Sequence, residues 1–245
     1  MDDALPIRRD HPMAQRFAGH DAPALEARLD TDGYAVLPSL LTAPECRGLA
    51  ACYDEDARFR NRVVMARHGF GRGEYRYFDH PLPPLVAALR RTLYVPLMTI
   101  ANRWQAALRR DERFPATHEA FLERCRDAGQ GRPTPLLLRY GPGDYNCLHQ
   151  DLYGAHVFPL QVAVLLAQPG EDYTGGEFVL TEQRPRRQSR ASVVPLRQGD
   201  AVVFAVNERP ATGARGTYRV VMRHGVSTVH SGRRHALGVI FHDAT

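Results

Sequence analysis

Short apolar runs separated by turn residues dominate the second half of the chain. Runs of this length, bounded by glycine, proline or polar clusters, predict β-strands. They lie at residues 136–140, 159–167, 176–181, 192–196, 200–206, 217–229 and 233–241. The first of them (Leu-Leu-Leu-Arg-Tyr) is almost continuously apolar, which is typical of a buried strand. The pattern therefore predicts a β-rich unit from residue 136 onward.

Helical signals occupy much of the first half. Residues 42–58 are predicted to form a helix, because Thr42 and Glu45 have the spacing of a capping box. Residues 83–110 are predicted to be mainly helical, with an interruption near Pro96. Proline lacks the amide hydrogen that a helix interior requires, so the interruption is expected there.

A third helix and an irregular stretch complete this half. Residues 116–128 are predicted to form a helix that ends at Gly129. Its residues His118 and Glu119 are expected at the surface. Residues 59–81 mix glycines with aromatic side chains and are predicted to be irregular. This stretch is interpreted either as a lid over a site or as a packed loop.

Length and composition fit one globular domain. The chain has 245 residues, of which 44% are hydrophobic, an ordinary fraction for a soluble protein. We interpret residues 1–245 as one domain, in which a mainly helical segment (30–130) supports a β-rich core (136–243). No apolar run approaches the roughly 18 residues of a membrane span. Residues 1–12 are charged and lack an apolar signal core, so secretion is not expected.

Cysteine and arginine usage add two expectations. The four cysteines form no Cys-x-x-Cys pair, which favours reduced thiols in the cytoplasm. The net charge is +5 and every basic side chain is arginine. The arginines gather in two clusters: Arg58, Arg60, Arg62, Arg67, Arg72 and Arg76, and then Arg184, Arg186, Arg187 and Arg190. Such clusters either form a solvated, salt-bridged surface or bind phosphates, so nucleic acid is a possible partner.

A His-x-Asp pair follows the first strand of the β-rich unit. Residues 141–143 (Gly-Pro-Gly) are turn signals that end the strand 136–140. His149 and Asp151 are therefore predicted to lie on or beside the next strand. Three flanking residues either pack in the loop or line a substrate entrance: Tyr145, Tyr153 and His156.

A second histidine and an arginine extend this pattern. His224 and Arg234 lie in two predicted strands, 217–229 and 233–241, which are expected to pair as a hairpin through a turn at Ser231-Gly232. Since side chains alternate across a strand, both residues can face one pocket. Two imidazoles and one carboxylate on one face of a metal form a non-haem Fe(II) site with open positions opposite. The arginine could then anchor a dicarboxylate cosubstrate.

Three other histidines compete with His224 for the role of second imidazole. His230 is predicted in or beside the turn, only four residues before Arg234, where it is poorly placed to share the pocket. His235 and His242 are interpreted as ordinary strand-face or surface histidines.

From residue 30 onward the chain resembles the Fe(II)/2-oxoglutarate-dependent dioxygenases. Residues 139–151 are similar to the AlkB-type nucleic-acid demethylases, with Arg-Tyr, Pro-Gly and Leu-His-Gln-Asp at matching spacing. Residues 224–226 (His-Gly-Val) resemble the distal histidine region of the same branch. Residues 32–38 resemble a first strand common to the wider superfamily.

Other motifs resemble the prolyl-4-hydroxylase branch. They are the spacing of His224, Val229, Gly232 and Arg234, the turn at residues 175–178 (Gly-Gly-Glu-Phe), and residues 199–204 (Gly-Asp-Ala-Val-Val-Phe). The resemblance implies an α+β fold, a double-stranded β-helix (jelly roll) with flanking N-terminal helices.

The resemblance also implies roles for individual residues. His149, Asp151 and His224 would bind Fe(II) as the metal ligands of the catalytic centre. Arg234 would form a salt bridge with the far carboxylate of 2-oxoglutarate, since its planar guanidinium suits a bidentate carboxylate. Tyr140 would hydrogen-bond the same cosubstrate. With O2, such an enzyme hydroxylates a C–H bond and releases succinate and CO2.

The chain departs from both branches at several positions. Leu138 stands where AlkB-type enzymes have an asparagine, and Ile240 stands where they have a second arginine. Leu165 or Leu166 lies near the place of a cosubstrate tyrosine in some prolyl hydroxylases. The main prediction is therefore a dioxygenase with an unidentified substrate. The alternatives are an AlkB-like oxidative demethylase of nucleic acid and a non-catalytic jelly-roll sensor or binding protein.

Overall fold

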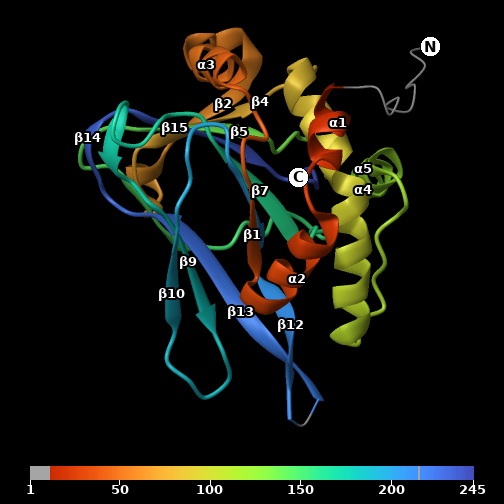
Figure 1. The fold of residues 1–245 in the computed structure, drawn as a ribbon. Helices are drawn as coiled ribbons and strands as arrows, with labels where there is room; N and C mark the ends of the chain where they lie inside the picture. Colours follow the sequence, from red (N-terminus) through yellow and green to blue (C-terminus); the bar gives the residue numbers. More distant parts are fainter. Residues whose placement is uncertain (1–11, 215) are drawn as a thin grey trace, which may run out of the picture.

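Two facing antiparallel sheets form the centre of the molecule, and helices lie against one side of them (Figure 1). The computed structural model describes residues 12–214 and 216–245. Residues 1–11, which carry the prediction of no signal peptide, lie outside the described residues. None of the described helices combines the length and apolar character needed to cross a bilayer.

The larger sheet has seven strands among the described residues. Their order is β1 (Tyr34–Leu37), β11 (Ala201–Ala205), β7 (Leu160–Leu165), β15 (Arg234–Val239), β5 (Leu136–Tyr140), β4 (Glu74–Phe78) and β2 (Phe59–Val64). The central strands are apolar on both faces because helices cover one face and the second sheet covers the other. All five residues of β11, for example, are buried.

The smaller sheet faces the larger one. Its order is β10 (Arg190–Val194), β9 (Phe178–Gln183), β13 (Gly216–Val226), β6 (Tyr145–His149) and β3 (Gly71–Arg72), and β12 (Glu208–Gly213) also pairs with β13. A separate short pair joins β14 (Val229–Gly232) to β8 (Tyr173–Gly175). This is the jelly roll that the resemblance implies, and each run predicted as a strand overlaps one.

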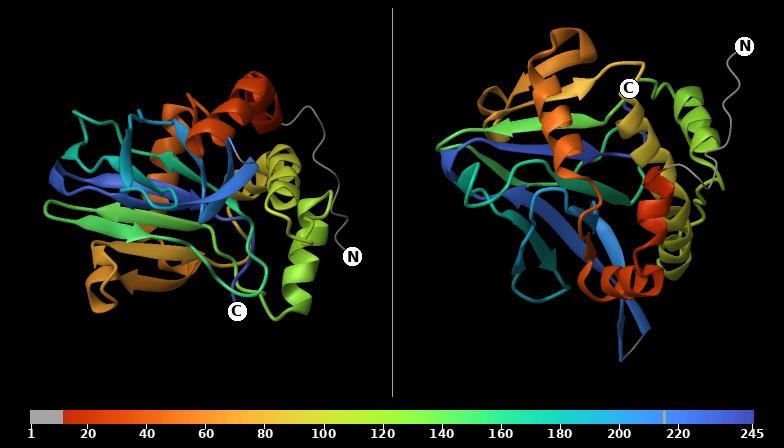
Figure 2. Two further views of the ribbon diagram at one scale, coloured as in Figure 1. Left: turned by 90° about the horizontal axis from the view of Figure 1, so that it is seen from below. Right: turned by 45° about the horizontal axis from the view of Figure 1, so that its top comes forward.

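Five α-helices are found in the described part of the chain: α1 (Pro12–Ala18), α2 (Ala22–Asp32), α3 (Ala43–Ala51), α4 (Pro84–Ala107) and α5 (His118–Asp127). Figure 2 shows in both views that α4 and α5 lie together at one side of the sheets. Leu89, Leu93 and Leu97 of α4 join the same apolar core as Val162 and Leu237 of the larger sheet. This packing buries the outer face of the sheet.

Two helix predictions need correction. The capping box of Thr42 and Glu45 is present, but the helix ends at Ala51 and continues as two 3-10 turns, η1 (Cys52–Asp54) and η2 (Asp56–Arg58). The predicted interruption at Pro96 is wrong, because α4 continues through it. A proline inside a helix costs roughly 3 kcal/mol. The apolar face that α4 buries before and after the proline offsets this cost.

Residues 59–81 are not irregular. Strands β2 and β4 pair with each other, and β4 also pairs with β5, so this segment widens the larger sheet. The glycines serve the connection between the strands. Gly71 has φ of +127°, and a Cβ there would lie 2.4 Å from the carbonyl oxygen of Tyr145. The close approach lets β3 pair with β6 in the opposite sheet.

The predicted hairpin of β13 and β15 is also wrong. The two strands lie in opposite sheets, and β14 connects them. Ser231 and Gly232 belong to β14, whose backbone pairs with β8 instead of forming a tight turn. His118 is buried rather than exposed: its ring packs against those of Tyr94 and Phe241, and its Nε2 lies 2.8 Å from the carbonyl oxygen of Phe241.

Candidate metal centre

The His-x-Asp motif begins at His149, the last residue of β6, and Asp151 follows two residues later, just beyond the strand. The predicted turn precedes β6: the Gly141 amide donates to Asp144 Oδ2 at 2.8 Å, and Gly143 has φ of +81°. Strand β6 then pairs with β13 so that His149 lies directly opposite His224. Register alone therefore brings together two histidines that are 75 positions apart in the sequence.

The three predicted ligands form one compact group. Their ligand atoms all lie within 4.8 Å of one another. His149 Nε2 is 3.5 Å from Asp151 Oδ1, and His224 Nε2 is 3.4 Å from Asp151 Oδ2. The ring centroids of the two histidines are 4.2 Å apart. Two imidazole nitrogens and a carboxylate at these spacings fit one metal ion bound on a single face.

The electrostatics of the group suit a cation. Burial alone would raise the pKa of Asp151, but hydrogen bonds from His149 and His224 hold it well below its usual range. Burial lowers the pKa of His224, which favours the neutral imidazole that binds metals. At His149 burial opposes the positive charge, yet Asp151 outweighs it and raises the pKa. Because Asp151 is ionised, the group can bind either a proton or a metal cation.

Neighbouring groups hydrogen-bond to two of the three predicted ligands and to the residue between them. His149 Nδ1 lies 2.8 Å from the carbonyl oxygen of Cys147, which leaves Nε2 for the metal. The Tyr153 hydroxyl donates to Asp151 Oδ1 at 2.8 Å. Burial, followed by the charge of Asp151, raises the pKa of Tyr153, so its hydroxyl remains a donor. Gln150 donates to the carbonyl oxygen of Met222 at 2.8 Å and so ties the motif to β13.

Arg234 and Tyr140 lie side by side on the larger sheet. They are register partners of β15 and β5, and both are buried. The guanidinium carbon of Arg234 lies 5.5 Å from the centre of the Tyr140 ring and 6.0 Å from that of Tyr173. Neither Arg234 Nε nor the Tyr140 hydroxyl has a hydrogen-bond partner among the described residues. A buried guanidinium without a carboxylate partner fits an anionic ligand, since unpaired buried charge is costly.

Both groups open into one cavity of about 390 Å³ between the sheets. Its lining includes all five predicted site residues, His149, Asp151, His224, Arg234 and Tyr140. The sequence predicted that His224 and Arg234 share a pocket, and they do. They reach it from opposite sheets rather than from one hairpin.

The rival histidines lie elsewhere. His230 is exposed, His235 packs near Tyr53, and His242 is fully buried and accepts a hydrogen bond from the Phe158 amide. None of these three histidines lines the cavity. The flanking residues divide in their roles, because Tyr153 lines the cavity whereas His156 lies 3.6 Å from Glu112.

The structure also shows where the residues lie at which this chain departs from the two branches. Leu138 lines the cavity, so no side-chain amide is present at that position. Ile240 is buried in an apolar cluster with Tyr77 and Leu136. Leu165 and Leu166 are buried in the core. None of these four positions therefore offers a polar side chain to a cosubstrate.

Several cavity residues were not singled out from the sequence. They are Leu136, Gln161, Ala163, Phe178 and Phe204. Gln161 is buried, and its Oε1 has no partner among the described residues. The only signal in the sequence was a single polar residue in the otherwise apolar strand 160–165.

A family model matches most of this chain. It is the Oxygenase-NA model, described as an oxygenase catalysing oxidative methylation of damaged DNA, and it matches residues 73–244. The chain belongs to this family. As the sequence predicts, it is a 2-oxoglutarate-dependent non-haem iron oxygenase that uses Fe(II), 2-oxoglutarate and O2.

Relatives of known sequence include two from Mycobacterium tuberculosis. The uncharacterized proteins MT2286 (strain CDC 1551 / Oshkosh) and Rv2227 (strain ATCC 25618 / H37Rv) are each 49% identical to this oxygenase over 167 residues. Each match covers 68% of this chain and 72% of the relative.

Solved structures share the fold at low sequence identity. A prolyl 4-hydroxylase from Phytophthora capsici is 17% identical, with a TM-score of 0.54, over 97% of this chain and 66% of that chain. The α-ketoglutarate-dependent epimerase SnoN of nogalamycin biosynthesis is 18% identical, with a TM-score of 0.54, over 89% and 81%. A 2OG-Fe(II) oxygenase family protein from Burkholderia pseudomallei is 17% identical, with a TM-score of 0.51, over 93% and 94%.

Proposed function

We propose that His149, Asp151 and His224 hold the catalytic Fe(II), and that Arg234 and Tyr140 bind 2-oxoglutarate. The observation that carries this assignment is the shared cavity. The histidine–aspartate–histidine group lies at one wall, and a buried arginine whose Nε has no hydrogen-bond partner among the described residues lies at the other. The donor set fits Fe(II) because imidazole and carboxylate are the ligands of non-haem iron oxygenases. The arginine fits the far carboxylate of the cosubstrate.

Bound Fe(II), with 2-oxoglutarate and O2, supplies the oxidation of a substrate C–H bond with release of succinate and CO2. The chain contributes the geometry of this reaction. Arg234 and Tyr140 fix one end of the cosubstrate and thereby direct its other end toward the ligand group. The apolar side chains Leu138, Phe178 and Phe204 line the space between the sheets and limit the access of water.

For the substrate we propose a damaged base in single-stranded nucleic acid. The description of the family supports this class. The rim of the cavity supports it independently. Six large apolar side chains are exposed among the described residues, and four of them, Phe70, Tyr145, Leu148 and Leu152, belong to the cavity or to β6 and the loop after it. Exposed aromatic and apolar groups at a cavity mouth suit the face of an unstacked base.

The segment that reaches the cavity at Gly69 and Phe70 is rich in arginine. Between Asp56 and Glu74 the chain carries arginines but no acidic residue. Arg67 and Arg72 are exposed, and they flank His68 and Phe70, whose rings stack 5.3 Å apart. Arg72 Nε also lies 4.0 Å from Asp144 Oδ1, a longer separation than those of the second arginine cluster from Glu182. Interleaved arginines and aromatic rings are typical of surfaces that bind single strands.

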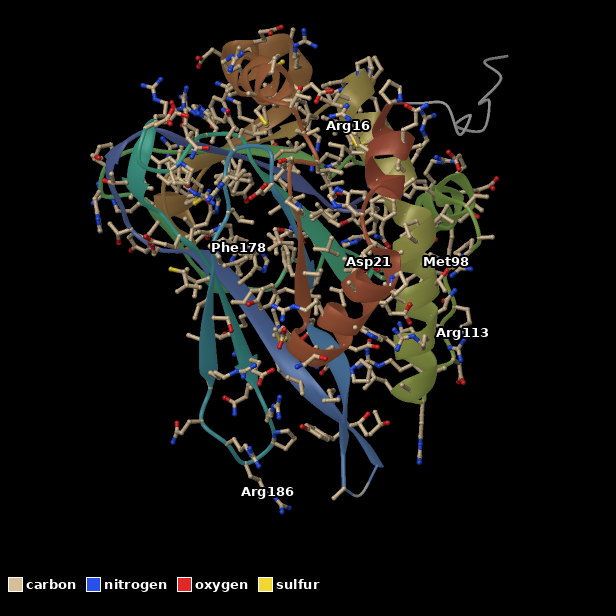
Figure 3. The ribbon with its side chains drawn as sticks, viewed as in Figure 1. Arg16, Asp21, Met98, Arg113, Phe178 and Arg186 are labelled. Atoms are coloured by element: carbon tan, nitrogen blue, oxygen red, sulfur yellow. The ribbon has the colours of Figure 1, made fainter. Side chains whose placement is uncertain are left out.

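The second arginine cluster is poorly placed for this role. Arg184 and Arg190 lie 2.9 and 3.3 Å from Glu182. Figure 3 shows Arg186 at the tip of the β9–β10 loop, far from Phe178 at the cavity end of β9. Six strand residues separate the two regions, roughly 20 Å at about 3.3 Å per residue. This loop therefore provides a control surface.

The test combines turnover with binding. Single-stranded oligonucleotides with one N-methylated base are incubated with Fe(II), 2-oxoglutarate and O2, and loss of the methyl group is followed by mass spectrometry together with succinate. We expect coupled conversion of a methylated strand. Succinate release with no conversion of any methylated strand would contradict the substrate class. No succinate under any condition would favour a non-catalytic sensor.

Binding of the same strands separates the two arginine clusters. Paired substitutions Arg67→Glu and Arg72→Glu should weaken binding and flatten its salt dependence, which is about −0.7 in log K per log salt for each single-strand phosphate contact. The matched pair Arg186→Glu and Arg187→Glu should leave the slope unchanged. Equal effects of both pairs would contradict the assignment of the rim.

A further inference from the structure

Tyr153 lies beside the metal ligands and has no role in the function proposed above. Its hydroxyl donates to Asp151 Oδ1 at 2.8 Å, and its ring lines the cavity. We infer that Tyr153 is a positioning residue for the metal carboxylate, one that fixes the rotation of Asp151 before the metal binds. The inference rests on the proposed ligand group of His149, Asp151 and His224.

Asp151 needs such a partner because its two oxygens face different ligands. Oδ1 lies 3.5 Å from His149 Nε2, whereas Oδ2 lies 3.4 Å from His224 Nε2. Rotation of the carboxylate about its Cβ–Cγ bond would change both of these oxygen–nitrogen distances at once. A hydrogen bond to Oδ1 from a third direction opposes that rotation. Partners of this kind, one step beyond the ligands, orient metal sites and tune their affinity.

The tyrosine ring is itself held from two sides. It meets Tyr77 edge-on, with centroids 6.5 Å apart and an interplanar angle of 88°. On another side it lies 6.3 Å from the ring of His242, which is fully buried. The hydroxyl therefore reaches Asp151 from a ring with little freedom to move.

Gln130 anchors the backbone of the same loop. This fully buried side chain places Nε2 3.1 Å from the Tyr153 carbonyl oxygen and 3.0 Å from that of His156, and its Oε1 accepts from the His156 amide at 2.7 Å. Gly154 fits closely against it, since a Cβ there would lie 2.3 Å from the Gln130 amide carbon. Gln130 Nε2 also lies 2.6 Å from the carbonyl oxygen of Asp243.

These contacts form a continuous support from the C-terminal segment to the metal carboxylate. Asp243 forms a buried ion pair with Arg90 of α4 at 2.7 Å. Gln130 joins that segment to the loop, and Tyr153 joins the loop to Asp151. The ligand group is thus positioned by the helical side of the molecule as well as by the register of β6 and β13.

The test is Co(II) binding to the full chain, followed by the visible absorption of the bound ion. Tyr153→Phe keeps the ring and removes only the hydroxyl. We expect it to weaken Co(II) binding by about 10–100-fold, the usual cost of losing such a partner, and to shift the absorption spectrum. Tyr218→Phe, the same change on β13 away from the cavity, should leave both unchanged. Circular dichroism should show that all variants are folded.

The outcomes separate this inference from the metal centre itself. Co(II) binding by Tyr153→Phe within threefold of the wild type, with an unchanged spectrum, would overturn the inference if His149→Ala abolishes binding. If His149→Ala also binds like the wild type, the ligand group is misassigned and the inference fails with it. Weaker binding and a shifted spectrum in Tyr153→Phe alone, beside an unchanged Tyr218→Phe, support the inference.

Discussion

At the scale of single residues, the cavity contains a guanidinium that has no counter-ion. Arg234 is buried, and no carboxylate among the described residues pairs with it. Charge-assisted hydrogen bonds contribute about 1.5–3 kcal/mol each. Arg234→Ala should therefore raise the dissociation constant for 2-oxoglutarate by a factor on the order of 10–100 or more. Calorimetric titration with 2-oxoglutarate in the presence of a divalent metal measures this effect.

Tyr140→Phe provides the graded comparison. It removes one neutral hydrogen bond, typically worth about 0.5–1.5 kcal/mol, so we expect a smaller loss of affinity than in Arg234→Ala. The ring remains beside Arg234, and the fold should be unchanged. Unaltered 2-oxoglutarate binding in Arg234→Ala would show that the cosubstrate lies elsewhere.

The three metal ligands give a second prediction at this scale. His149→Ala, Asp151→Ala and His224→Ala should each remove metal binding at micromolar concentration, because each deletes one member of a facial set. His230→Ala is the matched control, since His230 is exposed and outside the cavity. Equilibrium dialysis against Fe(II) under nitrogen measures the bound metal. Loss of iron in His230→Ala but not in His224→Ala would reverse the assignment of the second histidine.

At the scale of elements, the turn after β8 sets the place of Arg234. Gly176 has φ of +64°, and a Cβ there would lie 2.9 Å from Arg234 Cδ and 2.8 Å from Val229 Cγ2. Gly176→Ala should displace the arginine and raise the 2-oxoglutarate dissociation constant, although it removes no functional group. Gly170→Ala is its control, because Gly170 also has positive φ (+81°) but a Cβ there would meet no atom within 4 Å.

Both glycine variants should lose stability, by roughly 1–2 kcal/mol, the cost of placing a side chain in the left-handed region. Only Gly176→Ala should lose affinity for 2-oxoglutarate. Equal affinities in the two variants would show that this turn does not position Arg234.

Glu45 of α3 forms an ion pair with Arg16 of α1, and this pair should make the stability of the fold depend on pH. Its carboxylate accepts from the Thr42 amide at 2.8 Å and pairs with Arg16 of α1 at 2.6 Å. The hydrogen bond from Arg16, with smaller help from Thr42, lowers the pKa of Glu45 to about 2. Because the folded value lies below the unfolded one, about 4.3, the stabilisation is fully present above that pH and is lost toward pH 2.

Glu45→Gln should therefore lower the free energy of unfolding at pH 7 by about 1–2 kcal/mol, a range that allows for solvent screening of this partly exposed pair. The difference from the wild type should shrink between about pH 4.5 and pH 2. Urea unfolding at several pH values measures it. A difference that stays constant across this range would contradict the proposed role of the pair.

Local sequence patterns predicted the strands themselves better than they predicted which strands pair with each other. Apolar runs predicted every strand of the β-rich unit except the short β6, β8, β12 and β14, which are largely polar or exposed. The sequence did not predict which sheet each strand joins. Strands β13 and β15 are separated only by β14, yet β13 pairs with β6 and β9 in one sheet, whereas β15 pairs with β5 and β7 in the other. The strands of residues 59–81 were missed, since their glycines resemble loop signals.

At the scale of the whole molecule, the jelly roll converts distant sequence positions into one site. The motif spacing predicted His149, Asp151, His224, Arg234 and Tyr140, and all five line one cavity. The remaining wall could not be predicted, because Tyr77, Gln161 and Phe204 reach the cavity through pairing between strands that local sequence does not specify. His118 was misplaced for the same reason, since its partner Phe241 belongs to the far end of the chain.

We propose that this cavity consumes 2-oxoglutarate at a metal held by His149, Asp151 and His224. The most direct measurement is succinate formed per protein from 2-oxoglutarate, Fe(II) and O2 with a methylated single-stranded oligonucleotide, by the wild type and by Asp151→Ala. We expect repeated turnover by the wild type and only background succinate from the variant. Equal succinate from both proteins would contradict this proposal.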